Sequence, residues 1–349
     1  MLDIDAAWSN FCDGTYDNTQ PVSETNTIQK SPKCSDLYIS TKTKISYLTQ
    51  TIDINKVFWE IPINEYHKPV EGIIKKQMKL NSNNEDDFNA IQKKIALEKE
   101  KHAYVDEHVI QRIVNTDGRI KYKDVRKISV GLSKKDIISY RCKKKGAFYN
   151  CFVLIIRVKY EDTFKEIHVK IFNTGKLEIP GIQNDELLTK TLAILINTMK
   201  EFVGDNLSYI KSKTETVLIN SNFKCGYFID RERLFDIIKT KYNINSSYDP
   251  CSYPGIQCEF YYDHSLSNQT GKKPANNKFT KVSFMIFRTG SVLIVGKCCE
   301  SILNNIYIFV KNMLESEFSE IHIPVMEDEF HKKTATKKQT RKKTIMINK

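Results

Sequence analysis

The sequence has no run of about eighteen apolar residues, so no membrane-spanning helix is predicted. Its first residues, MLDIDAAWSN, lack the basic start and apolar core of a signal peptide. Its nine cysteines include no CxxC pair, which argues against a disulfide framework and against a zinc site. Together these absences predict a protein of a reducing intracellular compartment that is neither secreted nor bound to a membrane.

Catalytic motifs are missing as well. The chain has no HExxH, P-loop or GxSxG pattern. Its isolated carboxylates and histidines lack partners at catalytic spacing and are better explained as helix caps or surface charges. They are Asp185, Glu186, Asp230, Glu232, His168, His264 and His322. We therefore predict that the protein is not an enzyme, and we assign it no cofactor and no metal.

Positive charge is concentrated in two places. The whole chain carries a formal net charge of +12. Residues 119–145 hold eleven Lys or Arg against two acids, +9, and residues 332–349 hold eight Lys or Arg and no acid, +8, so 12 − 17 leaves −5 elsewhere. Such one-sided segments usually contact polyanions, so we expect a nucleic-acid ligand. The alternative is a solvated loop and a solubilising tail.

One short motif occurs twice. Residues 171–181 read IFNTGKLEIPG and residues 286–296 read IFRTGSVLIVG, at an offset of 286 − 171 = 115. Each copy predicts a strand, a tight turn at Thr-Gly and a second strand. Each is followed by a segment whose apolar residues have helical spacing. The pattern indicates an internal duplication.

Around the hairpins the sequence predicts an α+β fold, in which each half reads strand, helix, antiparallel strands and helix. Residues 36–205 form the expected first repeat and residues 206–325 the second. A charged insertion at about 80–145 interrupts the first repeat, and its apolar residues between 88 and 113 predict a helical stretch. Residues 1–35 are expected to be disordered, and residues 326–349 form a basic disordered tail.

Four features resemble the TATA-box-binding protein family, in the divergent form carried by large DNA viruses. The hairpins are similar to the family's repeated IF-x-SGK-x-x-x-TG element, and a long helix ends each half. Residues 246–262, SSYDPCSYPGIQCEFYY, resemble its SSYEPELFPGLIYRM stretch, and residues 50–59, QTIDINKVFW, resemble the segment that opens its first helix. The resemblance covers about 36–79 and 146–320, and it is more specific in the second half.

This resemblance implies a saddle in which two pseudo-symmetric repeats form one curved antiparallel sheet with helices on the convex face. In the family the concave face lies on the minor groove of DNA, where apolar rings wedge between base steps and kink the duplex. Matched position by position, the wedges are Phe172 and Phe287 in the hairpins, and Tyr253. The fourth wedge is Phe148, with Phe152 as the alternative; each of these rings could instead be a core aromatic.

The same matching assigns groove-contacting residues beside the wedges. Asn220, or alternatively Asn222, takes the place of an asparagine that reads base edges, whereas the first half offers only Ser40 and Thr41 there. The remaining matches are two cations, which could equally be solvated, and two apolar groove residues. They are Lys176, Arg288, Leu293 and Val295.

Two departures from the family pattern concern the hairpins. A threonine that contacts a base edge in the family is replaced by Pro180 in the first copy and by Val295 in the second. Because residues two apart in a strand share a face, Glu178 and Pro180 are expected beside Phe172. A carboxylate is repelled by the minor groove, so the first half is predicted to bind DNA poorly or at a different sequence.

The resemblance thus implies a transcription initiation factor, monomeric on DNA, that binds and bends AT-rich promoter duplexes. Its partners would be other initiation factors or RNA polymerase subunits, in a nucleus, a cytoplasmic viral factory or a virion. The alternative is a scaffold of the same fold that binds proteins through its helices and DNA only weakly.

Overall fold

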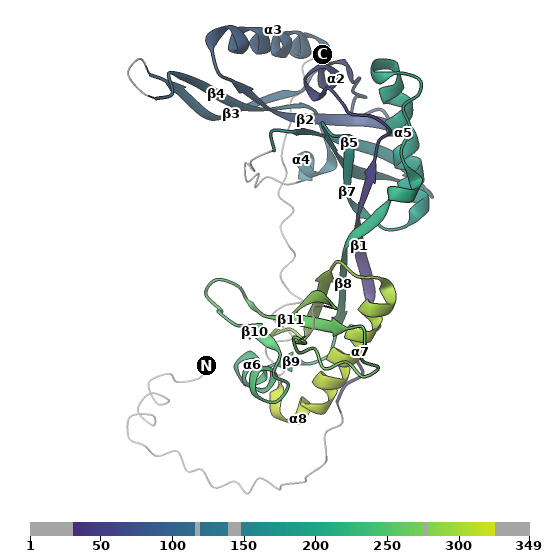
Figure 1. The fold of residues 1–349 in the computed structure, drawn as a ribbon, viewed down its shortest axis with the longest axis vertical. Helices are drawn as coiled ribbons and strands as arrows, with labels where there is room; N and C mark the ends of the chain where they lie inside the picture. The colour runs from purple at the N-terminus through teal and green to yellow at the C-terminus, as the bar shows by residue number, and fades with distance from the viewer. Residues whose placement is uncertain (1–30, 116–118, 139–147, 276–277, 325–349) are drawn as a thin grey trace, which may run out of the picture. The chain divides into compact units, whose positions relative to one another are not determined.

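The computed structural model describes residues 31–115, 119–138, 148–275 and 278–324 (Figure 1). The expected disorder of residues 1–30 and of the basic tail lies outside these ranges, as do residues 139–147 of the basic segment.

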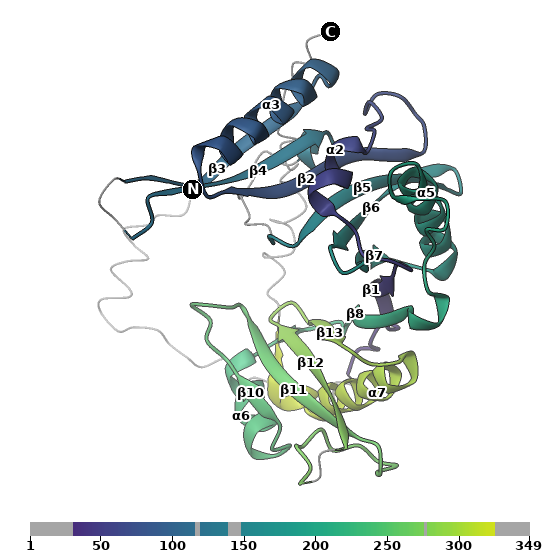
Figure 2. The ribbon, with the colours of Figure 1, turned by 45° about the horizontal axis from the view of Figure 1, so that its top comes forward.

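Within the described residues, twelve strands form one sheet in which all neighbouring strands are antiparallel. Their spatial order is β10-β11-β12-β13-β8-β1-β7-β6-β5-β2-β4-β3, so β1 and β8 are neighbours in the middle (Figure 2). The strands are β1 (Tyr38–Tyr47), β2 (Gly72–Ser82), β3 (Val105–Val114), β4 (Tyr122–Gly131), β5 (Cys151–Tyr160), β6 (Thr163–Phe172), β7 (Lys176–Ile182), β8 (Glu215–Lys224), β10 (Asn245–Ser247), β11 (Gly255–Asp263), β12 (Phe279–Phe287) and β13 (Ser291–Gly296).

Helices alternate with groups of strands, which confirms the predicted α+β class. They are α2 (Ile54–Glu60), α3 (Glu85–Lys101), α4 (Lys134–Ile138), α5 (Asp185–Val203), α6 (Arg231–Thr240), α7 (Glu300–Ser316), α8 (Phe318–Ile321) and the short 3-10 helix η1 (Lys211–Lys213). A small separate ladder pairs β9 (Phe228–Ile229) with β14 (His322–Ile323). We call β1 to α5 the first half and β8 to β14 the second half; the exact repeat boundaries stay predictions.

Local chemistry explains why the helices start where they do. The carboxylate of Asp53 accepts hydrogen bonds from the amides of residues 55 and 56 and so caps α2. In the second half, the Asp230 carboxylate caps α6 in the same way, by accepting hydrogen bonds from the amides of residues 232 and 233. The side-chain oxygen of Asn184 accepts from the Leu187 amide and caps α5. The matching aspartate caps of α2 and α6 are consistent with the internal duplication.

Both hairpins turn at a glycine in the left-handed region, Gly175 with φ +80° and Gly290 with φ +72°. A Cβ on Gly290 would stand 2.2 Å from the backbone oxygen of Tyr227, and one on Gly175 would stand 2.5 Å from that of Gln50. In each turn the glycine amide donates to the carbonyl of the phenylalanine that ends the first strand, at 2.9 Å. The glycine of each Thr-Gly pair is therefore required by backbone geometry.

This geometry predicts that Gly290→Ala lowers the free energy of unfolding by about 1–3 kcal/mol, because both the φ angle and the contact with Tyr227 oppose a side chain. Chemical denaturation of the two proteins measures the difference. Gly181→Ala is the matched control, because its φ is also positive, at +87°, but a Cβ there would meet nothing within 4 Å. Equal losses for both variants would show that the contact is unimportant.

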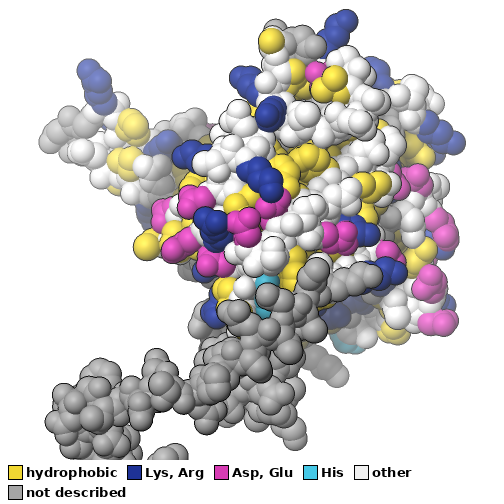
Figure 3. Space-filling view, turned by 90° about the horizontal axis from the view of Figure 1, so that it is seen from below, with side chains coloured by type: hydrophobic (Ala, Val, Ile, Leu, Met, Phe, Trp, Pro, Cys, Tyr) yellow, Lys and Arg dark blue, Asp and Glu magenta, His cyan; other side chains and the backbone are white. Residues whose placement is uncertain are grey.

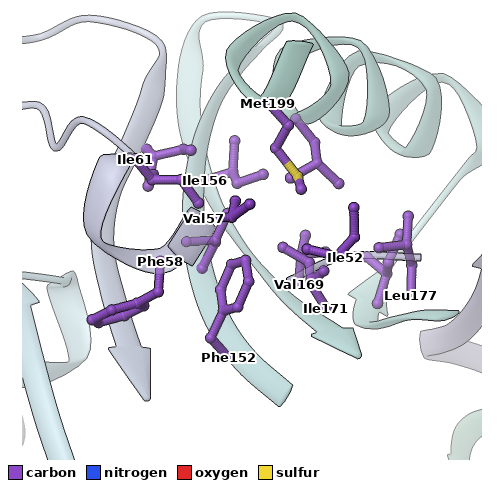
Figure 4. Close-up of a cluster of buried hydrophobic side chains, with 14 of the residues drawn as sticks. Ile52, Val57, Phe58, Ile61, Phe152, Ile156, Val169, Ile171, Leu177 and Met199 are labelled. Atoms are coloured by element: carbon purple, nitrogen blue, oxygen red, sulfur yellow. The ribbon is translucent and has the colours of Figure 1, made fainter. Parts of the chain in front are cut away.

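Each half has its own hydrophobic core on the helix side of the sheet. In the first half, Phe152, Val169, Ile171 and Leu177 of the strands pack with α2 and α5 (Figure 4). In the second half, buried strand residues pack with α6 and α7; among them are Ile256, Phe260, Phe284 and Ile294. Because side chains alternate along a strand, the residues between these positions point to the opposite side, which we call the open face.

The segment predicted as a helical insertion differs from expectation. The helix α3 ends at Lys101, and residues 105–114 form the strand β3 rather than a continued helix, so that prediction was wrong. β3 pairs with β4, and β4 pairs with β2, which was not predicted either. β2 was not predicted because Lys76 occupies a core position of that strand, where α3 supplies Glu98 as its partner, 3.0 Å away. This buried charge hides the apolar alternation that normally marks a strand.

Candidate nucleic-acid interface

The residues assigned as DNA contacts in the two hairpins lie on the open face. In the first hairpin, Ile171 and Leu177 are buried in the core, so Phe172 and Lys176 point to the other side. In the second, Val292 and Ile294 are buried, which places Leu293 and Val295 on the open face. The two hairpins therefore present equivalent strand positions on the same side of the sheet.

Tyr253 and Phe287 form an aromatic pair at the outer end of the second hairpin. Their ring centroids are 5.9 Å apart and their planes are inclined by 59°. The rings lie over Gly255, which pairs with Phe287 across β11 and β12. A Cβ on Gly255 would be 3.0 Å from one ring and 3.2 Å from the other. The glycine thus leaves the space in which both half-buried rings stand on the open face.

A tight turn holds Tyr253 in this position. Its amide donates to the Asp249 carbonyl at 2.9 Å, and the Asp249 carboxylate accepts from the Cys251 amide and the Ser252 hydroxyl. These hydrogen bonds, chiefly that from Ser252, lower the pKa of Asp249. The Arg231 guanidinium donates to the Pro254 carbonyl. The hydrogen bonds of the SYDPCSYPG stretch therefore hold the Tyr253 ring against Phe287.

Between the hairpins the open face is lined by small polar and apolar side chains. Asn220 on β8 is exposed and pairs in register with Val295 on one side and Thr41 on the other. The alternative, Asn222, donates its amide to the Ser40 hydroxyl at 2.7 Å. Asn220 therefore has its amide exposed at the centre of the face, whereas Asn222 is engaged within the sheet.

The first half has a looser arrangement of aromatics. Phe172 is half-buried, with the Lys176 ammonium 5.7 Å from its ring centroid. Phe148 is 63% exposed, and its ring lies 5.7 Å from the Lys170 ammonium. The alternative to Phe148 is excluded as a wedge, because Phe152 is fully buried in the core.

Position 151 explains part of this difference between the halves. Cys151 pairs with Phe172 as Gly255 pairs with Phe287, so a thiol stands where the second half has no side chain. Burial raises the pKa of this thiol, so it stays uncharged.

Glu178 lies on the same face as Phe172, as strand alternation requires, but it is not an isolated charge. Lys170 is directly opposite it across β6 and β7, and the ammonium is 2.5 Å from the carboxylate. Both side chains are 28% exposed. The ion pair offsets the repulsion that a bare carboxylate would exert on a phosphate-rich ligand. The sequence did not reveal this pair, because it depends on the register of the hairpin. Pro180 follows on the same face.

Part of the open face is covered. Near the turn that joins β5 to β6, Arg157 donates to the carbonyls of Tyr66 and Lys68 at 3.0 and 2.8 Å. The amide of Lys134, at the start of α4, donates to the Glu166 carboxylate at 2.9 Å. The uncovered part of the open face therefore lies near the Thr-Gly turns of the two hairpins, where the candidate wedges are.

Among the described residues, no helix is long and apolar enough to cross a membrane. The same ranges contain no group of three or more His, Cys, Asp and Glu side chains placed to hold a metal ion. The expectation that the protein is not an enzyme has no direct test in this geometry and stays a prediction.

The fold and this face together define an α+β protein with one antiparallel sheet that buries one side under helices and presents paired aromatics on the other. No known family model matches the sequence. The chain is 24% identical over 204 residues to a TATA-box-binding protein-like protein of Acanthamoeba polyphaga mimivirus, and the match covers 54% of each chain. The chain thus matches about half the length of that relative. This similarity confirms the resemblance to a divergent viral TATA-box-binding protein-like protein.

A solved structure, Methanococcus jannaschii TBP, aligns with 81% of this chain and 99% of its own length, at 11% identity and a TM-score of 0.38.

Proposed function

We propose that the protein is a DNA-binding transcription initiation factor that binds and bends promoter duplexes through the minor groove. The observation that carries this proposal is the pair of rings, Tyr253 and Phe287, standing over Gly255 on the open face. Aromatic side chains usually end in a core, whereas these two project from the side of the sheet that the helices leave open. Such rings can wedge between base pairs and exchange base–base stacking for base–ring contact.

The centre of the face suits a minor groove for a chemical reason. A·T pairs present only acceptors there, adenine N3 and thymine O2, and the exposed amide of Asn220 can donate to them. Guanine adds an amino group that would crowd the apolar residues beside it, Leu293 and Val295. The proposed ligand is therefore AT-rich duplex DNA.

The first half is proposed to contact the same duplex. Phe172 supplies the ring, and Lys176 lies beside it to meet a phosphate. The ion pair between Lys170 and Glu178 offsets most of the repulsion that was predicted between the Glu178 carboxylate and the minor groove. Weaker wedging is expected here than in the second half, since Phe148 is largely exposed and Cys151 occupies the place of Gly255.

The protein partners are proposed to bind the helices, by analogy with the similar viral protein's name as TATA-box-binding protein-like. One exposed apolar side chain on α7, Ile308 at 45%, favours such a contact. If the open face did not bind DNA, the alternative would be a scaffold that uses only this helical side.

The test compares two duplexes of equal length, one with an AT-rich centre and one with a GC-rich centre, each labelled at both ends for energy transfer. We expect tighter binding and shorter end-to-end distance for the AT-rich duplex. Asn220→Ala is expected to reduce this preference by roughly 5- to 10-fold, because about 1–1.5 kcal/mol of hydrogen bonding to base edges is lost. The matched control is Asn305→Ala on α7. Equal binding and no bending of either duplex would refute the proposal.

A further inference from the structure

The outer strands of the first half carry a row of cations on the open face. Met78 and Ile128 are buried on the helix side of β2 and β4, so their neighbours Lys79 and Lys127 point to the open side. Lys79 and Lys127 are directly opposite one another in the register, and His108 of β3 is opposite Lys127. Lys123, four residues before Lys127 on β4, lies on the same face. We call Lys79, Lys123 and Lys127 the basic face.

Like charges placed directly opposite in a sheet are unfavourable, so this arrangement needs a reason. Most of the neighbouring carboxylates do not supply it, because they are engaged elsewhere, and Asp106 of β3, opposite Ser129, offsets the charge of Lys127 only in part. Asp124 and Glu107 both bind Arg126 on the helix side, and Asp136 binds Lys75 at 2.7 Å. Burial and the charge of Lys75 lower the pKa of Lys127. An external anion would relieve the repulsion that the fold leaves in place.

The basic face adjoins the aromatics of the first half. The Lys79 ammonium lies 3.6 Å from the ring centroid of Tyr149, the residue after Phe148. A duplex seated at Phe172 and Phe148 would reach these lysines next, on a continuation of the same sheet face.

The second half has no such extension in the described residues. On the open face of its outer strand β11, Glu259 accepts from Tyr261 and forms an ion pair with Lys281 at 2.8 Å. The surface is not basic everywhere, since another view of the molecule shows Lys and Arg interspersed with Asp and Glu (Figure 3). The excess of cations is therefore specific to one end of the sheet.

We propose that the basic face binds the phosphate backbone of duplex DNA flanking the bent site, on the side of the first half only. The proposal rests on the proposed function, because it takes the duplex to lie on the open face. A strand rises about 3.3 Å per residue, so Lys123 and Lys127 are about 13 Å apart and can meet different phosphates of one backbone. This contact would fix the direction in which the protein sits on a nearly symmetric AT-rich site.

The test uses the full chain with an AT-rich duplex extended by a flank on one end or the other. In the variant Lys79→Gln/Lys123→Gln/Lys127→Gln, hydroxyl-radical protection of a single flank is expected to disappear while energy-transfer bending of the centre is retained. The slope of log Kd against log salt concentration should fall by about 2–3, because each phosphate contact contributes about 0.9. The matched control, Lys56→Gln/Lys93→Gln/Lys239→Gln, removes three exposed lysines from the helices and should change neither result.

A milder variant, Lys79→Gln/Lys123→Gln, keeps the half-buried Lys127 and should lower the slope by about 2 if the triple variant is poorly folded. Retained bending with unchanged flank protection and slope would overturn this inference alone. Polyglutamate serves as a probe for an acidic protein ligand. If the triple variant lost polyglutamate binding while its salt slope for DNA stayed unchanged, the inference would also be overturned, and the basic face would be assigned to an acidic protein. A wild-type protein that bends no duplex would overturn both proposals.

Discussion

Replacing Tyr253 and Phe287 together by alanine is expected to abolish bending of an AT-rich duplex and to weaken its binding by roughly 30-fold or more. A base stacked on an aromatic ring contributes about 1–3 kcal/mol, so two rings contribute at least about 2 kcal/mol, and each 1.4 kcal/mol is tenfold in affinity. Bending should be lost because the kink exists only while a ring occupies the opened base step. End-to-end energy transfer and a titration of the same labelled duplex measure both effects.

The matched control removes another aromatic pair of the second half, Tyr242 and Phe309. Their centroids are 6.2 Å apart at 82°, and they pack against the second core beside α7. The double alanine variant of this pair should lose stability but bind and bend DNA as the wild type does at a temperature where it is folded. If the Tyr253 and Phe287 variant bent DNA normally, the wedge assignment would be wrong.

Removal of the buried carboxylate of Glu98 is expected to lower the free energy of unfolding by about 3–5 kcal/mol in the variant Glu98→Ala. The side chains of Lys76 and Glu98 are 1% and 4% exposed, and their charged atoms are 3.0 Å apart. Burial lowers the pKa of Lys76, which shows that the fold disfavours its charge. Without Glu98 that charge keeps only the carbonyls of Trp59 and Ile61 as partners among these contacts. Breaking one side of a buried pair leaves an uncompensated charge.

Chemical denaturation measures this loss, and Glu100→Ala is the control. Glu100 is exposed on the same helix, so its replacement should change the free energy of unfolding by less than about 0.5 kcal/mol. Lys76→Met/Glu98→Leu should recover most of the stability, because an apolar pair of similar size needs no desolvated charge. A loss below about 1 kcal/mol for Glu98→Ala would mean that water reaches Lys76.

The local sequence was sufficient to predict the two hairpins and the capped starts of the helices. Gly175 and Gly290 mark turns that no other residue fits, and Asp53 and Asn184 mark helix starts through hydrogen bonds to nearby amides. All of these features depend on residues within a few positions of one another.

Features that depend on distant partners were not predictable. β2 was missed because Lys76 stands at a core position, and its partner Glu98 belongs to a helix 22 residues further on (98 − 76). The ion pair of Lys170 with Glu178 requires the hairpin register. The space that Gly255 provides for two rings becomes visible only when β11 lies against β12.

The central position of β1 has a consequence for how the chain acquires its structure. Lys42 pairs with Ile182 on one side and Ile219 on the other, 140 and 177 residues further along the chain (182 − 42 and 219 − 42). During synthesis, β1 therefore leaves the ribosome long before either neighbour exists, with both of its backbone edges unpaired. Contacts this distant in sequence form slowly, and unpaired edges invite association with other chains. We therefore expect the pairing of β1 with β7 and β8, where the two halves meet, to limit the rate at which the sheet assembles.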